Sequence, residues 1–362
     1  MSKQKSLNYS DYLSLNNILN SQNLISNNNG KPAHDEMLFI IVHQTYELWF
    51  KQILYELDSV ISIFSKKVIA EPDISLGVNR LNRIIEIQKI LIDQIRILET
   101  MSAMDFLEFR DDLFPSSGFQ SSQFRLLENK FGLRPGDRIR YGKTGYKNTL
   151  NPKDRESVIE SENNDNLFIL LENWLERTPF LSFKGFNFWE QYSQAIRKML
   201  KKEERIIKSN PNLISDEIEY QLKEHQKTLK SFEALLNQSQ HQGLVRKKKK
   251  RLSHKATQAA LLIFLYREEP ILHSPYNFLS KLLDIDELFT AWRQRHALMV
   301  RRMIGSKIGT GGSSGHAYLE NTSSHHKVFT DIADLSTFII PRSILPKLPK
   351  TIKQNLGYHF KI

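Results

Sequence analysis

Two histidines lie in apolar, helix-like segments, where an imidazole could bind a metal ion or a cofactor. His43 stands in HDEMLFIIVHQTYELWFKQ and shares a helix face with Phe39, Tyr46 and Phe50, while His296 stands in FTAWRQRHALMVRRMIG. No H-E-x-x-H motif is present, which excludes a thermolysin-type zinc site. Two neutral imidazoles on aromatic-rich helices suit a non-covalent haem, with one as iron ligand and one on the open side. Two hydrogen-bonded core histidines are the alternative.

The composition narrows the chemistry available around these histidines. The 362 residues include no cysteine, which excludes disulfides, thiolate catalysis, iron–sulfur clusters and covalent haem attachment. The N-terminal residues lack the apolar core of a secretory signal, and no stretch reaches the roughly 18 to 20 apolar residues that span a bilayer. We therefore expect a cytoplasmic protein with no membrane partner.

The net charge of +11 raises nucleic acid as a partner, because basic patches attract phosphate backbones. The densest basic run, Arg246–Arg251, precedes a predicted helix, and such runs are usually solvated connections. We expect no nucleic-acid partner, and a basic helical protein that binds nucleic acid is the alternative. Four histidines in polar surroundings are likewise expected on the surface: His225, His241, His325 and His326.

The glycine-rich segment GSKIGTGGSSG, Gly305–Gly315, is a further stretch that could bind a ligand. Its lysine, Lys307, precedes the glycines, whereas a P-loop carries its lysine after the last glycine. A helix rather than a strand precedes the segment, so a dinucleotide loop is not expected either. The segment is either a surface linker or a mobile lid that closes over a ligand with the Thr310 hydroxyl inward.

Apolar residues at helical spacing dominate the segments that must position His43, His296 and the glycine-rich segment. Besides the helix around His43, this spacing predicts helices over residues 78–98, 164–180, 186–208, 215–238, 253–270, 284–305 and 325–340. The segment 140–146, RYGKTGY, is a candidate hairpin, but no sheet can be assembled. The predicted fold is all-α, with a single-domain helical bundle over residues 31–362. An N-terminal arm, residues 1–30, precedes it and ends in an Asn-rich loop.

Several long segments resemble, in the same order, those of the tryptophan 2,3-dioxygenase family. They are HDEMLFIIVHQTYELWFKQILYELDSV, FLEFRDDLFPSSGFQSSQFRLLENKFG, DIDELFTAWRQRHALMVRRMIGSKIGTGGSSGHAYL and KVFTDIADLSTFIIPR, with LNYSDYLSLNNIL at the N-terminus. The resemblance implies an all-α fold enclosing a b-type haem, one per subunit, in a homotetramer built as a dimer of dimers. It also implies insertion of both atoms of O2 across the indole C2–C3 bond of L-tryptophan. The product would be N-formylkynurenine, in the first step of tryptophan degradation by the kynurenine pathway.

The resemblance also implies roles for individual residues. His296 would be the axial ligand of the haem iron, and His43 the distal catalytic residue that hydrogen-bonds the indole N–H. Arg110 would hold the substrate carboxylate, which suits the planar fork of a guanidinium. Taken alone, Arg110 could equally form a surface ion pair with Asp111 or Glu108. The other implied contacts are Phe39, Ile40, Ile41, Val42 and Phe106 around the indole, Ser117 and Thr310 on the substrate, and Gly118 at the haem edge.

Two tyrosines of the arm, Tyr9 and Tyr12, resemble the pair that reaches into a neighbouring subunit's pocket, although they could simply anchor the arm. The chain departs from the family pattern at Glu320, where arginine is usual, at Ser122, where leucine is usual, and at His316, where tyrosine is common. These departures keep open a related haem dioxygenase that acts on a substituted tryptophan or indole. A haem-binding sensor without turnover is the non-enzymatic alternative.

Overall fold

The computed structural model describes residues 7–139, 145–179, 181–183, 185–310 and 315–357. Within these ranges the secondary structure is helical apart from one antiparallel hairpin of β1 (Ser182–Phe183) and β2 (Phe186–Asn187). One continuous hydrophobic core joins the helices. The predicted all-α, single-domain fold is therefore confirmed.

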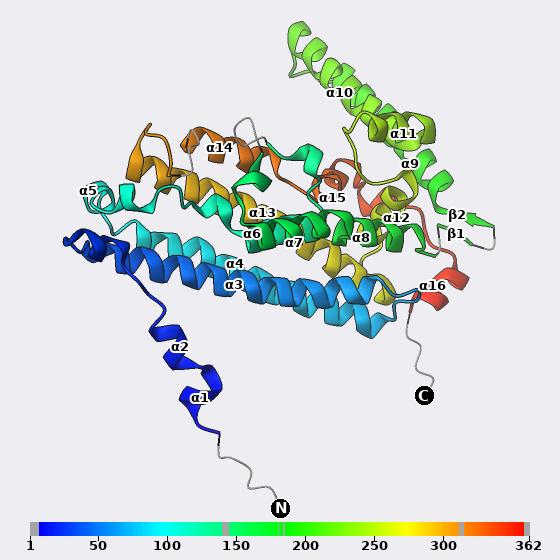
Figure 1. The fold of residues 1–362 in the computed structure, drawn as a ribbon. Helices are drawn as coiled ribbons and strands as arrows, with labels where there is room; N and C mark the ends of the chain where they lie inside the picture. The colour runs from blue at the N-terminus through cyan, green and yellow to red at the C-terminus, as the bar shows by residue number, and fades with distance from the viewer. Residues whose placement is uncertain (1–6, 140–144, 180, 184, 311–314, 358–362) are drawn as a thin grey trace, which may run out of the picture.

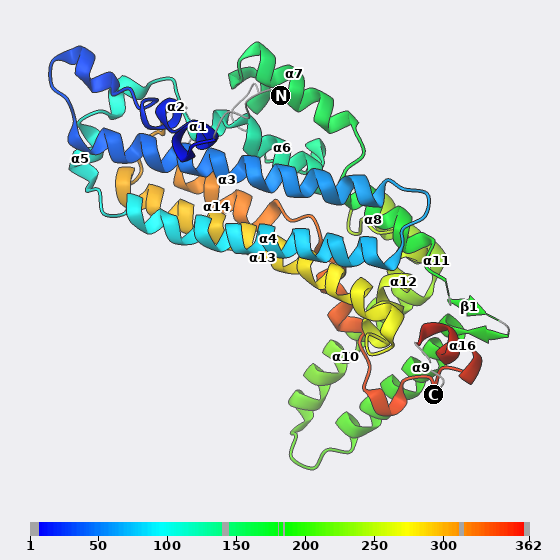
Figure 2. The ribbon, with the colours of Figure 1, turned by 90° about the horizontal axis from the view of Figure 1, so that it is seen from below.

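Three long helices form the centre of the molecule (Figures 1 and 2). α3 (His34–Phe64) and α4 (Glu71–Leu98) make an antiparallel hairpin, and α13 (Pro270–Ile304) packs along α4. Each helix buries a stripe of aliphatic and aromatic side chains at helical spacing, which holds the three together. The bundle thus supplies two long helices, α3 and α13, on which His43 and His296 stand.

The three helices approach closely at one small residue. The rings of Phe64 on α3 and Phe278 on α13 stack with their centroids 4.4 Å apart. A Cβ atom on Gly77 of α4 would lie only 3.2 Å from the Phe278 ring. Glycine at this position therefore lets the aromatic pair fill the space between the helices, as close packing of a core requires.

Shorter helices cover this core. They are α5 (Ala103–Leu107), α6 (Ser122–Phe131), α7 (Pro152–Asn163), α8 (Leu167–Glu176), α12 (His254–Leu265), α14 (His316–His325), α15 (Thr330–Ala333) and α16 (Lys350–Leu356). α6 packs on α3 and α14 packs on α13, so segments distant in sequence surround the two histidine-bearing helices. Short 3-10 helices span Ile25–Asn29, Arg110–Leu113, Gly118–Gln120, Pro135–Asp137, Tyr146–Thr149, Asp334–Phe338 and Arg342–Ile344.

An extension lies at the end of the bundle opposite α5 (Figure 1). It consists of α9 (Phe188–Lys208), α10 (Ser215–Leu236) and α11 (Gln238–Arg246), and α10 projects from the body. The basic run follows α11. Its last residue, Arg251, lies 3.8 Å above the Phe168 ring and donates to the carbonyl of Gly132 at 2.7 Å. The end of the run therefore joins the extension to the body, while its first residues are exposed.

The N-terminal arm carries two short helices, α1 (Tyr9–Leu13) and α2 (Leu15–Leu19), neither of which has a buried residue. In Figure 1 the arm extends away from the bundle. The Asn-rich stretch that joins the arm to α3 is ordered by the buried carboxylate of Glu36. This group accepts hydrogen bonds from the backbone N–H groups of Ile25 at 2.7 Å and Ser26 at 3.0 Å.

Several sequence-based boundaries are wrong. α13 begins at Pro270 rather than at residue 284, because proline is well suited to the first position of a helix. The helix predicted over 325–340 is broken, since the Asp286 carboxylate accepts the backbone N–H groups of Val328 and Phe329 and holds a turn there. Residues 140–144 of the predicted hairpin lie outside the described residues.

Three of the four histidines expected on the surface are buried. His225 and His241 are buried, and hydrogen bonds from their Nε2 atoms to the carbonyls of Leu200 and Leu252, at 3.1 and 2.9 Å, satisfy the polar rings there. His326 is also buried, and His325 is exposed as expected. No helix in the described ranges is long and apolar enough to span a bilayer. The cytoplasmic location stays a prediction.

Candidate active site

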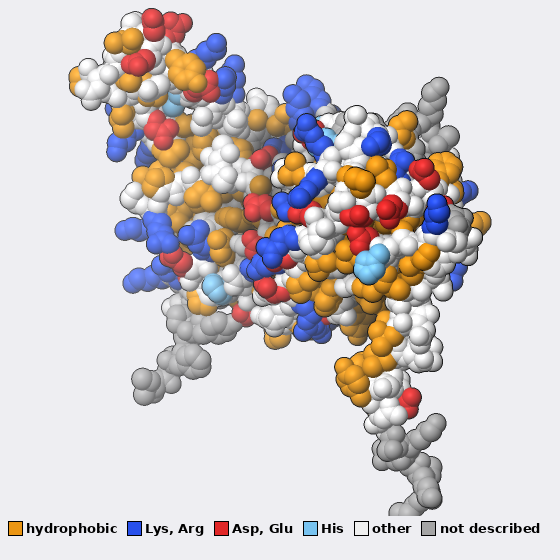
Figure 3. Space-filling model, turned by 90° about the vertical axis from the view of Figure 1, so that its left-hand side faces the viewer, with side chains coloured by type: hydrophobic (Ala, Val, Ile, Leu, Met, Phe, Trp, Pro, Cys, Tyr) orange, Lys and Arg blue, Asp and Glu red, His pale blue; other side chains and the backbone are white. Residues whose placement is uncertain are grey.

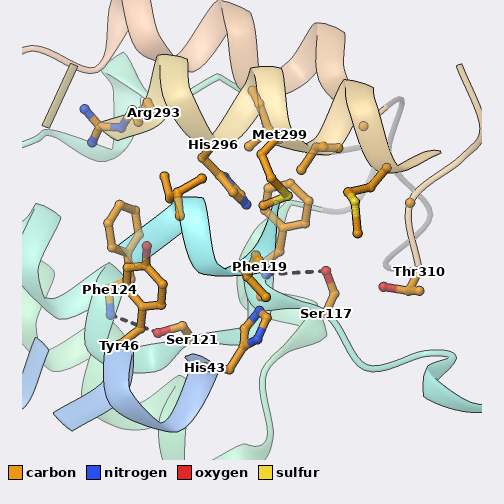
Figure 4. A pocket seen from close by; sticks show the side chains of 18 of the residues that line it. His43, Tyr46, Ser117, Phe119, Ser121, Phe124, Arg293, His296, Met299 and Thr310 are labelled. Carbon is orange, nitrogen blue, oxygen red and sulfur yellow. Dashed lines mark hydrogen bonds between the residues drawn. The ribbon is translucent and has the colours of Figure 1, made fainter. Parts of the chain in front are cut away.

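A cavity lies between α3 and α13, and its walls carry the two histidines (Figure 4). His43 projects from α3 and His296 from α13, and in Figure 4 the two rings point toward one another across the cavity. Helical spacing brings further side chains of α3 and α13 to the same walls, and α5, α6 and α14 close the sides. The aromatic lining residues are Phe39, Tyr46, Phe50, Phe106, Phe119, Phe124, Trp292 and Tyr318.

His296 offers an uncharged imidazole to the cavity. Its ring stacks on Trp292, one turn earlier, with centroids 5.3 Å apart and planes 14° apart. Burial lowers the pKa of His296 to about 4, and the nearby His43 adds to that shift. Within the described ranges the His296 ring has no hydrogen-bond partner, and it lines the cavity. A neutral nitrogen with an available lone pair is a good ligand for iron.

His43 is held in one orientation and one tautomer. Its Nδ1 lies 2.7 Å from the carbonyl oxygen of Phe39, and its ring packs on the Phe39 ring at 4.1 Å. Because a carbonyl oxygen only accepts, the proton must reside on Nδ1, which leaves Nε2 as an acceptor. Burial lowers the pKa of His43, so the ring stays neutral. The side chain can therefore accept a hydrogen bond from a ligand N–H group.

Arg110 stands at one end of the cavity, in a 3-10 helix after α5. Its Nη1 donates to the Asp111 carboxylate at 3.1 Å, and its Nη2 donates to the carbonyl of Ile308 in the glycine-rich segment. The Nε atom of Arg110 is buried and has no hydrogen-bond partner. Thr310 lines the same cavity. Arg110 therefore brings a positive charge, and one N–H group without a partner among the described residues, to this end of the cavity.

Of the glycine-rich segment proposed as a lid, residues 311–314 lie outside the described residues. The described part that precedes them, including Gly309 and Thr310, lines the cavity. Ser117 and Gly118 reach the cavity from the segment between α5 and α6. A Cβ atom on Gly118 would meet open space, so the glycine leaves room on that wall.

A buried charged cluster forms another part of the wall. Glu128 of α6 accepts from Arg125 and Arg293, each at 3.0 Å, and from Arg138. His326 Nδ1 lies 3.3 Å from the same carboxylate. Burial alone would raise the pKa of Glu128, but the surrounding arginines hold it well below its usual range. Local sequence patterns carry no signal for this cluster, because its members are spread over four segments.

The structure brings most of the expected site residues to one cavity. Those that line it are Phe39, His43, Phe106, Arg110, Ser117, Gly118, His296 and Thr310. Ile40, Ile41 and Val42, expected on the same wall, are not among the residues that line this cavity. Their contact with the indole stays a prediction. Ile41 is 45% exposed, and Val42 is buried in the core.

Tyr9 and Tyr12 do not reach this chain's cavity, since they lie on the arm and are 73% and 70% exposed. Two of the departures from the family pattern meet on α14, where His316 Nδ1 lies 3.8 Å from Glu320 across one helical turn. The third, Ser122, opens α6 directly after its cap residue Ser121. All three positions therefore lie on the helices that close the sides of the cavity, α6 and α14, rather than on α3 or α13.

Together, the fold and the cavity define a helical protein with an aromatic pocket between two neutral histidines. The family model described as tryptophan 2,3-dioxygenase matches residues 1–339. A relative of that name from Bdellovibrio bacteriovorus is 49% identical over 358 residues, covering 99% of this chain and all of the relative. Another from Dictyostelium discoideum is 47% identical, covering 100% of this chain and 90% of its own. The chain belongs to the tryptophan 2,3-dioxygenase family.

A vertebrate relative extends this similarity. The tryptophan 2,3-dioxygenase of Xenopus tropicalis is 48% identical over 350 residues, which cover 96% of this chain and 86% of the relative. Similarity of this extent in a bacterium, an amoeba and a frog confirms the resemblance that the long sequence segments indicate. The roles of the individual residues remain predictions.

Proposed function

We propose that this cavity would bind one haem b per subunit, with His296 holding its iron, and L-tryptophan on the side of His43. The enzyme is a haem-dependent dioxygenase of tryptophan, as its family membership shows. The observation that carries the assignment of residues is the pair of neutral imidazoles facing one another across an aromatic cavity. The reaction inserts O2 across the indole C2–C3 bond and yields N-formylkynurenine.

The residues present fit a haem. Among the described residues, no three histidine, aspartate or glutamate side chains converge on one point as a metal site would require. The iron of a haem needs only one ligand from the protein, because the nitrogens of the macrocycle supply the rest. His296 is neutral and faces an aromatic cavity, which suits the flat apolar macrocycle. When bound, the haem supplies the activation of O2.

The protein's own part is to bind and orient the indole. His43 Nε2 is the acceptor that would receive the indole N–H, while the proton on Nδ1 is donated to the Phe39 carbonyl. The ring centroids of Phe39 and Phe106 lie 5.8 Å apart at that wall, and these rings would pack against the flat indole. The apolar lining excludes water, which strengthens each of these polar contacts.

Arg110 and Thr310 would hold the amino-acid end of the substrate. The unpartnered Nε of Arg110 and its flanking Nη form the edge that binds a carboxylate through two parallel hydrogen bonds. The Thr310 hydroxyl, at the same cavity, is a suitable partner for the ammonium or carboxylate. A substituted indole without a carboxylate would leave Arg110 unused, and the names of the similar relatives do not favour such a substrate.

We also propose that the protein is a homotetramer, a dimer of dimers, whose residues 1–30 reach a neighbouring subunit. Hydrophobic side chains lie exposed along the arm (Figure 3), among them Leu7, Tyr9, Tyr12 and Leu19. A second exposed stripe follows α3 at Met37, Ile41, Leu48 and Tyr55. Exposed apolar surfaces of this kind are typical of subunit interfaces.

Two experiments test these assignments. The haem-free protein is titrated with haem, and the His296→Ala variant should lose the Soret band while His325→Ala, at an exposed position, keeps it. Sedimentation should find a tetramer, and a chain lacking residues 1–20 should keep its haem but lose most tryptophan turnover. A normal Soret band in His296→Ala would contradict the iron ligand, and a fully active monomer would contradict the role of the arm.

A further inference from the structure

The positive charge of the chain is concentrated in the extension. Residues 188–251 hold 15 lysine and arginine residues against 8 aspartate and glutamate residues, which gives +7 of the chain's net charge of +11. In Figures 1 and 2 the extension lies at the edge of the molecule, beyond the end of the three-helix bundle. Most of the excess charge therefore stands on a part of the surface that a large partner can reach.

Helical spacing gathers the basic side chains of α9 on one face. The buried side chains of this helix recur every four residues, at Phe188, Tyr192, Ile196 and Leu200. Because a helix turns by about 100° at each residue, the positions opposite this buried face form a second stripe along the helix. That stripe is exposed and basic, and we call it the α9 stripe: Arg197, Lys198, Lys201, Lys202, Arg205 and Lys208.

The acidic residues of α9 do not neutralise the α9 stripe. Within the described ranges, Lys208 is its only member that forms an ion pair, with Glu204 at 2.6 Å. The carboxylate of Glu203 lies 3.9 Å from His225 of α10, and Glu190 stands in the first turn of α9, before the stripe begins. The remaining like charges follow one another at helical spacing, which destabilises a helix unless an anion comes to them.

Exposed apolar side chains lie beside the α9 stripe. Lys198 and Lys202 line a groove between α9, α10 and residues 337–346. Three exposed isoleucines line the same groove: Ile206, Ile339 and Ile344. Basic groups next to exposed apolar ones match the boundary of a bilayer, where anionic headgroups meet acyl chains. The isoleucines favour a lipid over a nucleic acid, whose bases stack on aromatic side chains that the α9 stripe lacks.

We propose that the α9 stripe binds the surface of a membrane that contains anionic lipids. The basic side chains meet the headgroup phosphates, and the exposed isoleucines of the groove meet the acyl boundary. Such a contact is peripheral and needs no spanning helix. It therefore revises our expectation of no membrane partner, which rested on the lack of a spanning segment. The groove shares no lining residue with the cavity between α3 and α13, so the contact does not depend on the proposed haem site.

The test is cosedimentation of the full-length protein with vesicles. Equal parts of phosphatidylcholine and phosphatidylglycerol form the anionic surface, and phosphatidylcholine alone forms the neutral one. The wild type should bind only the anionic vesicles, and about 1 M salt should abolish this binding, because it shortens the range of electrostatic attraction to roughly 3 Å. Each basic residue near an anionic surface strengthens binding about fivefold, so loss of three should weaken it about a hundredfold. The variant combines Arg197→Gln, Lys201→Gln and Arg205→Gln.

A matched variant separates the α9 stripe from the net charge of the chain. Arg246, Lys247 and Lys249 are exposed at the end of α11 and directly after it. Their replacement by glutamine removes three positive charges elsewhere on the extension and should leave vesicle binding within about threefold of the wild type. Unchanged turnover of L-tryptophan in both variants shows that each is folded.

Four outcomes would overturn the inference. The first two are no binding of the wild type to the anionic vesicles and equal binding to the neutral ones. The third is an equal loss in both variants, which would assign the effect to net charge. The fourth uses duplex DNA and poly-glutamate as soluble probes. If the α9 stripe variant loses binding to either probe but keeps its binding to vesicles, the partner is a nucleic acid or an acidic protein.

Discussion

Replacement of Arg110 by methionine tests how the cavity recognises an amino acid. At present Nη1 contacts Asp111, whose side chain is 90% exposed, Nη2 contacts the neutral carbonyl of Ile308, and Nε has no partner. A bound carboxylate would add one new charge-assisted hydrogen bond at Nε and exchange one existing bond. The net contribution is about 2–3 kcal/mol, so kcat/KM for L-tryptophan should fall about 30- to 150-fold.

The assay is the steady-state formation of N-formylkynurenine, with L-tryptophan and with tryptamine, which lacks the carboxylate. Arg110→Met should lower kcat/KM for L-tryptophan only and leave the value for tryptamine within about threefold of the wild type. Arg301→Met, at an exposed position on α13, should change neither value. An equal loss with both substrates would show that Arg110 acts through the structure rather than on the carboxylate, and no loss with L-tryptophan would refute the contact altogether.

Three further predictions concern stability of the haem-free protein. Burial lowers the pKa of His296 from 6.5 in the unfolded chain to about 4 in the folded protein, so protonation favours the unfolded state. The free energy of unfolding should keep its full value above pH 6.5 and fall by about 3 kcal/mol as the pH drops from 6.5 to about 4. Denaturant titrations should show this loss in the wild type and not in His296→Leu. Gly132→Ala should lower the free energy of unfolding by about 2–4 kcal/mol, because φ is +116° at this residue and a Cβ atom would lie 2.6 Å from Phe168. In Gly118→Ala the added Cβ meets open space, so calorimetry should find its stability unchanged. Glu128→Gln should cost about 3–5 kcal/mol in urea unfolding, because it leaves buried arginines without their carboxylate, and a change below about 1 kcal/mol would contradict this role.

Much of the fold follows from local pattern. Apolar residues at helical spacing predicted α9 and α10 to within two residues at each end. They also predicted α4 and α12, although α4 begins at Glu71, before the predicted residue 78, and α12 ends at Leu265, before the predicted residue 270. The same rule failed where a tertiary contact decides the backbone. The turn at Val328 and Phe329 is held by a carboxylate more than forty residues earlier in the chain, which no local pattern reveals.

The site was predictable to the extent that its residues share a helix face. His43 with Phe39, and His296 with Trp292, are each one turn apart, so their common wall can be read from spacing. Residues carried over as one continuous block do not all share that face, because a helix turns by about 100° at each residue, and Ile41 is 45% exposed. The charged wall around Glu128 depends on segments far apart in sequence, and only the folded chain reveals it.

Oxidation of L-tryptophan in this cavity, on a haem held by His296, can be tested directly by isotopic labelling. The haem-loaded, reduced protein is supplied with L-tryptophan and isotopically labelled O2, and the product is analysed by mass spectrometry. We expect N-formylkynurenine with both added oxygen atoms labelled, and no product from His296→Ala under the same conditions. Product carrying a single labelled atom, or a haem-loaded wild type that forms none, would contradict the proposed reaction.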